Sequence, residues 1–271
     1  MLEKLSEIKP KKINKPEHLK EEIAPIIACV GTPEDFKYDG KINWLLSGKP
    51  ITYAHNVDYF GKVEDLEKSG IKNDKSSYGG YVISPVDGLD KYSKKYHDCT
   101  GLIMTGKEKT TGKVLSFVSH QNPEIFLTMG RKKFTEDLMK QIEEIKKRCE
   151  DKTIDAVIVG GKYGKITSYS KFDSRSNRDM EEYADSIKFV SKIVKEMVNF
   201  EPSVITMPKT KVLNEKEETE DQGDMIFLDN DTKRLFIVRN RYAFGPEQNF
   251  VASELDEKRK NWEPGEWGLP I

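Results

Sequence analysis

Two residues in this sequence could perform covalent chemistry together: a cysteine and a histidine at the two ends of an expected β-hairpin. Residues 97–123 read HDCTGLIMTGKEKTTGKVLSFVSHQNP, so Cys99 opens one apolar stretch and His120 closes the next. The polar segment between them is typical of a turn. If residues 108–111 form that turn, Cys99 lies opposite His120, and opposed side chains share a face about 5 Å apart. A one-residue slip would place them on opposite faces.

Such a pair supplies a nucleophile and its base. A neighbouring imidazole stabilises the thiolate, which can attack a carbonyl carbon and release an amine or ammonia from the resulting thioester intermediate. His120 would act first as base and then as acid. A third group usually orients the imidazole, and the local candidates are Ser93, Tyr96, Gln121 and Asn122. The lysines of the segment KYSKK, just upstream, could add positive potential.

The same residues also have a purely structural interpretation. Unpaired cysteine is among the most buried residue types, so Cys29 in an apolar run and Cys149 on a helical apolar stripe are expected in the core. His97 is close enough to Cys99 to serve as an alternative base. No CxxC, HxH or HExxH spacing occurs, so we expect no zinc site.

Apolar periodicity predicts the elements that must position the hairpin. Residues 134–149 repeat apolar side chains every three or four positions, with Thr135 as a capping candidate, and residues 179–200 do the same; each predicts an amphipathic helix. Residues 153–161, TIDAVIVGG, predict a strand buried on both faces. Further strands are expected at 80–85, 99–106, 113–120, 203–211 and, as a hairpin, 224–240. We therefore expect a mixed α/β (α+β) fold, a largely antiparallel sheet or sandwich flanked by two helices.

The organisation along the chain suggests three parts. Residues 1–77 are expected to be an N-terminal extension, a flexible lead-in followed by a small lobe, with a short helix near 21–29. Residues 78–240 form the expected core, and residues 241–271 a tail that packs on it.

Composition limits the setting and the partners. The 271 residues are 36% hydrophobic and 34% charged, with a net charge of −1 that gives no reason to expect nucleic acid or an anionic membrane as partner. No apolar run reaches the ~18–20 residues that span a bilayer, and no signal-peptide core opens the chain. Three scattered cysteines suit a reducing compartment. We expect a cytoplasmic protein, or an effector exported without an N-terminal signal.

From Tyr81 onward, the order of elements resembles the chemoreceptor glutamine deamidase (CheD) family. It is similar also to the family's distant relatives, the catalytic domains of cytotoxic necrotizing factor toxins and the Burkholderia lethal factor. Four segments carry the resemblance: DCTGLIM opening with the cysteine, KVLSFVSH ending in the histidine, DAVIVGG with its paired glycines, and the helix YADSIKFVSKIVKEM leading to the closing hairpin DMIFLDNDTKRLFIVR. The similarity covers roughly residues 78–240 and is one of pattern more than identity.

The resemblance implies a protein glutamine deamidase without cofactors. Cys99 would attack the side-chain amide of a glutamine in a protein substrate, His120 would assist, and hydrolysis would leave glutamate. The family often has a threonine six residues before the cysteine; Ser93 occupies that position here and would orient His120. The approach to the cysteine, YHDC, departs from the family's glycine–cysteine, and Asp98 beside the nucleophile would raise the thiol pKa.

Other functions stay open at this point. Residues 1–77 resemble the elaboration of the toxin branch, so an effector aimed at another cell's protein is as reasonable as a chemotaxis enzyme. The YHDC departure alters the backbone around any oxyanion hole and favours a non-catalytic binding module that keeps the fold. A cysteine peptidase or a transglutaminase-like enzyme would use the same Cys–His pair.

Overall fold

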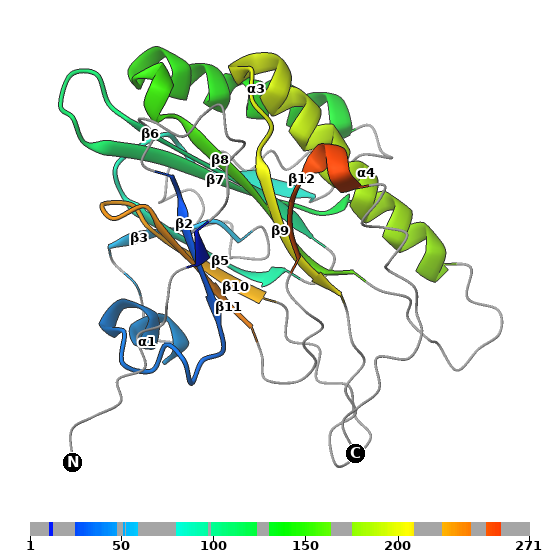
Figure 1. The fold of residues 1–271 in the computed structure, drawn as a ribbon, viewed down its shortest axis with the longest axis horizontal. Helices are drawn as coiled ribbons and strands as arrows, with labels where there is room; N and C mark the ends of the chain where they lie inside the picture. The colour runs from blue at the N-terminus through cyan, green and yellow to red at the C-terminus, as the bar shows by residue number, and fades with distance from the viewer. Residues whose placement is uncertain are drawn as a thin grey trace.

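Two β-sheets packed face to face form the centre of the molecule (Figure 1). The computed structural model describes residues 11–12, 25–47, 51, 53–58, 80–96, 99–123, 130–163, 175–208, 224–239 and 248–255. Sheet A contains β1 (Lys11–Lys12), β2 (Ile27–Gly31), β3 (Ala54–Asn56), β5 (Asp90–Tyr96), β10 (Asp224–Asp229) and β11 (Arg234–Val238). Sheet B contains β4 (Tyr81–Ile83), β6 (Thr100–Lys107), β7 (Val114–Gln121), β8 (Asp155–Tyr163), β9 (Ser203–Pro208) and β12 (Gln248–Val251).

The strand order is β1-β2-β11-β10-β5-β3 in sheet A and β12-β9-β8-β6-β7-β4 in sheet B. Antiparallel pairs predominate, and the parallel pairs are β2–β11, β3–β5 and β8–β9. The expected mixed α/β class, a largely antiparallel sandwich flanked by helices, is confirmed. Sheet A combines strands from the predicted N-terminal extension with strands from the predicted core.

Helices cover the outer faces of the sandwich. Helices α3 (Gly130–Arg148) and α4 (Arg175–Val198) lie on sheet B, and the shorter α1 (Gly40–Leu46) lies on sheet A, as Figure 1 shows. Single 3₁₀ turns, η3 (Asp151–Thr153) and η4 (Ala252–Glu254), follow α3 and β12. Among the described helices, none has the length and apolar character needed to cross a membrane.

The predicted apolar stripe of α3 is confirmed. Its side chains are fully buried against sheet B and α4: Phe134, Leu138, Ile142, Ile145 and, just past the helix, Cys149. The expected cap is wrong, because the helix begins five residues earlier and Thr135 lies inside it, its hydroxyl donating to the Arg131 carbonyl. Residues 155–159 are buried on both faces, as TIDAVIVGG predicts: Ala156 and Ile158 face the helices, and Val157 and Val159 face sheet A.

The expected short helix near residues 21–29 is wrong at its described C-terminal end. Ile27–Gly31 is not helical but forms β2, because it pairs in parallel with β11 in the middle of sheet A. A short apolar run fits a helix or a strand equally, and tertiary pairing decides between them.

Strand β5, which the sequence analysis did not predict, has the polar sequence DKYSKKY without a strand-like pattern of apolar residues. It lies between β10 and β3 in sheet A, and pairing with these two strands, not an apolar pattern of its own, determines its strand conformation.

Candidate functional site

The hairpin of β6 and β7 exists, but its register differs from the expected one. Thr100 pairs with Gln121 and Ile103 with Val118, so Cys99 is not directly opposite His120. The turn comprises residues 109–112 instead of 108–111, since Gly112 has φ +70° and belongs to the turn. Glycine tolerates this left-handed conformation, and its amide closes the turn by donating to the Glu108 carbonyl.

The error in register is two residues, and a shift of two preserves the face of every side chain. Cys99 and His120 are therefore diagonal neighbours on one face of sheet B, the arrangement in which long or aromatic side chains still reach each other. Val118, two residues before His120, belongs with Cys99 to the apolar layer between the sheets. The cysteine and histidine thus face sheet A, away from the helices.

Sheet A places Ser93 directly against His120. The Ser93 hydroxyl oxygen lies 2.8 Å from His120 Nδ1, and both side chains are fully buried. Ser93 pairs with Ile226 of β10, whose side chain points into the same inter-sheet layer. The serine that the resemblance implicates therefore contacts the histidine across the sandwich.

A β-bulge in β5 brings a second side chain to this histidine. Ile226 pairs with Ser93 but Asp224 pairs with Tyr96, so β5 holds one extra residue and both Ser93 and Tyr96 point inward. The Tyr96 ring stacks on the His120 ring with centroids 4.0 Å apart and planes 13° apart. Strict alternation would have turned Tyr96 to the other face.

Gly101 makes room for that stack. A Cβ at this position would lie 2.5 Å from the Ser119 carbonyl oxygen and 2.8 Å from the Tyr96 hydroxyl. The hydroxyl donates to the same carbonyl at 3.2 Å. Burial holds the pKa of the Tyr96 phenol well above its usual value, so the ring stays neutral at physiological pH.

Asp58, which follows β3, completes the group. Its Oδ1 accepts from the Ser93 hydroxyl at 2.9 Å and from the Lys94 amide at 2.6 Å, and it lies 3.9 Å from His120 Nδ1. We call Asp58, Ser93, Tyr96, Cys99 and His120 the His120 cluster. No sequence signal pointed to Asp58, because it stands 35 residues before Ser93 in a stretch without periodicity.

The hydrogen bonds of Ser93 determine which ring nitrogen of His120 carries the proton. Besides His120, the serine hydroxyl contacts the Val57 carbonyl at 3.2 Å and the Asp58 carboxylate, and both of these oxygens only accept. Because one hydroxyl proton cannot serve three acceptors, we infer that it goes to one of these oxygens and that Ser93 accepts from Nδ1–H of His120. That tautomer leaves the lone pair on Nε2, which is the state a general base requires.

The three cysteines differ in their surroundings more than in their exposure, and none is in a disulfide. Cys99 and Cys29 are each 7% exposed, and Cys149 is fully buried. Cys29 lies under α1 among apolar side chains. Burial raises the pKa of the Cys29 thiol, and it raises that of Cys149 to about 11. Of the three, Cys99 alone shares its layer with the Ser93–His120 pair.

The other sequence candidates lie elsewhere. Gln121 points to the helix side of sheet B, where it bonds Ser119 and Thr100. The backbone amide of Asn122 donates to the Gly80 carbonyl at the end of β7. His97 and Asp98 lie outside the described residues. Of the lysines upstream, Lys94 Nζ lies 5.9 Å from the centre of the Tyr92 ring, and Lys91 belongs to another cluster.

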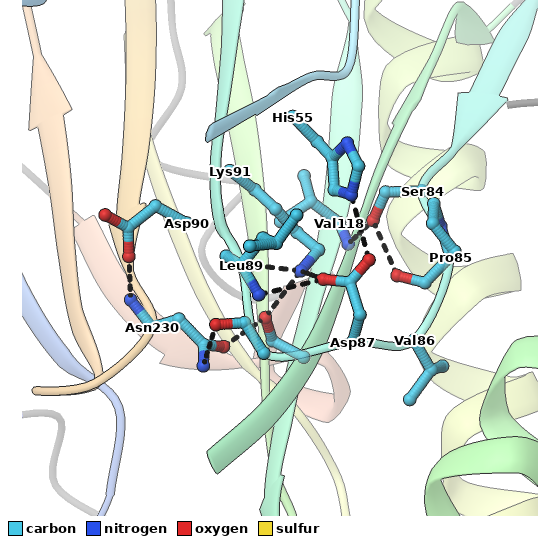
Figure 2. A network of polar contacts seen from close by, with 12 residues as sticks. His55, Ser84, Pro85, Val86, Asp87, Leu89, Asp90, Lys91, Val118 and Asn230 are labelled. Carbon is cyan, nitrogen blue, oxygen red and sulfur yellow. Dashed lines mark hydrogen bonds and ion pairs between the residues drawn. The ribbon is translucent and has the colours of Figure 1, made fainter. Parts of the chain in front are cut away.

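That second polar cluster occupies the same inter-sheet layer four residues away along β7, about 13 Å from His120. Figure 2 shows Lys91 and His55 converging on the Asp87 carboxylate, at 2.9 Å each. Lys91 also donates to the Leu89 carbonyl and to Ser116, and Ser116 donates to Asn230. We call His55, Asp87, Lys91, Ser116 and Asn230 the Lys91 cluster.

The buried charge of Lys91 faces an opposite charge in this second cluster. Burial alone would raise the pKa of the Asp87 carboxyl, but His55 and Lys91 hold it at about 2. Lys91 is fully buried, and its pKa is lowered by burial even with Asp87 beside it.

Within the part of the chain that the structure describes, no group of three or more His, Cys, Asp or Glu side chains is arranged to hold a metal ion. The described residues place Cys99 on the same face of sheet B as His120, and Ser93 of sheet A lies 2.8 Å from His120 Nδ1. No protein-family model matches the chain, and no curated protein matches it.

Proposed function

We propose that this chain is a cysteine-dependent hydrolase that deamidates glutamine side chains of a protein substrate. The observation that carries the proposal is the buried hydrogen bond of 2.8 Å between Ser93 and His120 Nδ1, on the face that Cys99 shares. A histidine that activates a thiol needs Nδ1 held and Nε2 basic.

The reaction follows from these roles. Nε2 of His120 takes the proton of the Cys99 thiol, and the thiolate attacks the amide carbon of glutamine. The imidazolium returns its proton to the nitrogen, so that ammonia leaves and a thioester to Cys99 forms. Water, deprotonated by His120, then cleaves the thioester and releases glutamate, which restores the thiol.

The choice of glutamine rests on the resemblance to the CheD family and the necrotizing toxins. Ser93 stands where those enzymes often have threonine, and its contact with His120 supports that correspondence. A peptidase or a transglutaminase-like enzyme would share the thioester step and differ in the substrate. Whether the chain acts in a cytoplasm or as an exported effector also stays a prediction.

A specific observation favours the second candidate, a non-catalytic binding module. His120 is fully buried and Cys99 is only 7% exposed, whereas a substrate must reach the sulfur. A buried polar cluster of this kind can also serve only to hold two sheets in register.

The rate at which Cys99 reacts with an alkylating reagent distinguishes the hydrolase from the binding module. Cys29 serves as a control within the same chain. Cys29 and Cys99 are each 7% exposed as residues, so Cys29 is the matched comparison for the labelling rate of Cys99. After brief iodoacetamide treatment at pH 6.5, peptide mass analysis should find Cys99 labelled about tenfold faster than Cys29. Labelling at this site should disappear in Cys99→Ala and slow in His120→Ala. Equal rates for Cys99 and Cys29 would make the binding module the better interpretation.

A positive result leads to the substrate. Extracts treated with wild-type protein or with Cys99→Ala should be compared for glutamines converted to glutamate. Conversion that requires Cys99 supports deamidation, while cleavage or cross-linking that requires Cys99 would assign a peptidase or a transglutaminase.

A further inference from the structure

We propose, on the basis of the function proposed above, that Asp58 is a positioning residue of this site, which orients Ser93 and stabilises the protonated form of His120. Asp58 belongs to the segment after β3, outside residues 78–240 where the resemblance to known deamidases lies. The site would therefore use a group that the resemblance does not supply.

The position of Asp58 is fixed from two sides. The Val57 amide donates to the Tyr92 carbonyl at 2.9 Å, which extends the β3–β5 pairing by one residue. The Lys94 amide, at the bulge of β5, donates to Asp58 Oδ1 at 2.6 Å. The same oxygen accepts from the Ser93 hydroxyl. One carboxylate oxygen therefore contacts both the bulge of β5 and the serine that lies against His120.

The charge of this carboxylate acts where the reaction creates a positive charge. When Cys99 gives its proton to His120, the ring becomes an imidazolium whose Nδ1 faces the Asp58 carboxylate. Asp58 Oδ1 lies 3.9 Å from Nδ1, and its side chain is only 13% exposed, so water screens the attraction little. The carboxylate therefore favours proton transfer from the thiol and increases the thiolate fraction near neutral pH.

Other groups near the ring are neutral or are paired with an opposite charge, so they do not stabilise the imidazolium as Asp58 does. Tyr96 from β5 stacks on the ring as a neutral phenol, and Cys99 is the proton donor. From β10, the Asp224 carboxylate binds the Arg239 guanidinium at 3.2 Å, which compensates its charge. From β4, the residue paired with His120 is Val82, which has no charge.

The test uses Asp58→Asn in the full chain, because an asparagine keeps the shape and the acceptor oxygen but removes the charge. Alkylation of Cys99 by iodoacetamide should slow by about tenfold at pH 6.5 and approach the wild-type rate at pH 9, so that the rate profile moves to higher pH. Asp58→Glu should restore part of the rate. Asp39→Asn is the matched control, since Asp39 also accepts two backbone amides but caps α1 on the outer face of sheet A.

Nitrogen-15 NMR of histidine gives a readout that mere destabilisation would not produce, and only four histidines need assignment. In Asp58→Asn, Nε2 of His120 should stay the unprotonated nitrogen at high pH, because Ser93 can still donate to the Val57 carbonyl. The ring should nevertheless protonate at lower pH than in the wild type. In Ser93→Ala the preference for this tautomer should be lost.

The outcomes separate the two proposals. If wild-type Cys99 labels faster than Cys29 and Asp58→Asn changes neither the rate nor the pH profile, the role of Asp58 is wrong and the proposed function stands. If wild-type Cys99 is no faster than Cys29, both are wrong. General unfolding would be recognised by faster labelling of Cys29 and Cys149, so unchanged rates at these two thiols show that the variant is folded.

Discussion

The two polar clusters between the sheets take side chains from the same parts of the chain. They differ in how their hydrogen-bond donors and acceptors are matched. Each cluster takes one side chain from β5, one from β7 and one from residues 54–58: Lys91, Ser116 and His55 in the Lys91 cluster, and Ser93, His120 and Asp58 in the His120 cluster. Both lie in the apolar layer that holds the sandwich together.

The Lys91 cluster is saturated. The ammonium has three N–H groups and three acceptors within 3.1 Å: Asp87, the Leu89 carbonyl and Ser116. In the His120 cluster, the one proton of the Ser93 hydroxyl has more acceptors than it can serve, since Val57, Asp58 and His120 all lie within 3.2 Å of the hydroxyl oxygen. Burial of polar groups alone does not indicate a reactive site, so the proposed function rests on the contact of Ser93 with His120 and on Cys99 in the same layer.

The largest effect should come from unpairing the buried lysine. Asp87→Ala leaves the Lys91 ammonium buried without its counter-ion and should lower the free energy of unfolding by about 3 kcal/mol, measured by urea denaturation. Adding Lys91→Met should recover part of the loss, since it removes the stranded charge. The relative labelling rates of Cys99 and Cys29 in the folded protein should not change. A change in those rates would mean that the two clusters act as one network.

Filling the space beneath Tyr96 should affect both stability and reactivity. In Gly101→Ala the new methyl group meets the Ser119 carbonyl and the Tyr96 ring, so the ring must leave its stack on His120. We expect a loss of about 2 kcal/mol in unfolding free energy and slower labelling of Cys99. Tyr96→Ala combined with Gly101→Ala removes the contacts with the ring but keeps the 2.5 Å contact with the Ser119 carbonyl, so the double variant measures the cost of the backbone contact separately. Unchanged labelling in Gly101→Ala would show that the stack does not position the histidine.

Acid should remove the contribution of the Lys91 cluster. The pKa of Asp87 is about 2 in the folded protein and about 4 in an unfolded chain, so its carboxylate stabilises the fold above pH 4. That stabilisation, about 2 kcal/mol, is lost as the pH falls from 4 to 2. The difference in unfolding free energy between wild type and Asp87→Asn should therefore shrink over this range. A constant difference down to pH 2 would contradict the assigned charge pair.

The smallest effect should follow removal of one hydroxyl. Tyr96→Phe keeps the stacked ring but loses the hydrogen bond to the Ser119 carbonyl, which should cost about 1 kcal/mol in thermal or urea unfolding. The labelling rate of Cys99 should stay within about threefold of wild type, because the Tyr96 hydroxyl takes no part in the proposed proton transfer from the thiol to His120. A larger drop in labelling would assign the hydroxyl itself to the site.

Part of the candidate site could be predicted from the sequence and part could not. The hairpin and the shared face of Cys99 and His120 were predictable because side chains alternate with a period of two, which an even error in register leaves unchanged. The turn was misplaced because nothing local shows that Gly112 adopts a left-handed conformation. Strand β5 was missed because its lysines obscure any apolar alternation.

The sequence by itself determined the elements whose apolar period is strong: helices α3 and α4, strand β8 and the β6–β7 hairpin. These patterns are local, since burial of one face dictates which residues repeat. The tertiary structure alone decided which polar residues meet. The bulge in β5 turns Tyr96 inward beside Ser93, and the parallel pairing of β3 with β5 brings Asp58 to them from 35 residues away. Such contacts depend on the pairing of distant strands, which leaves no periodic trace in the residues themselves.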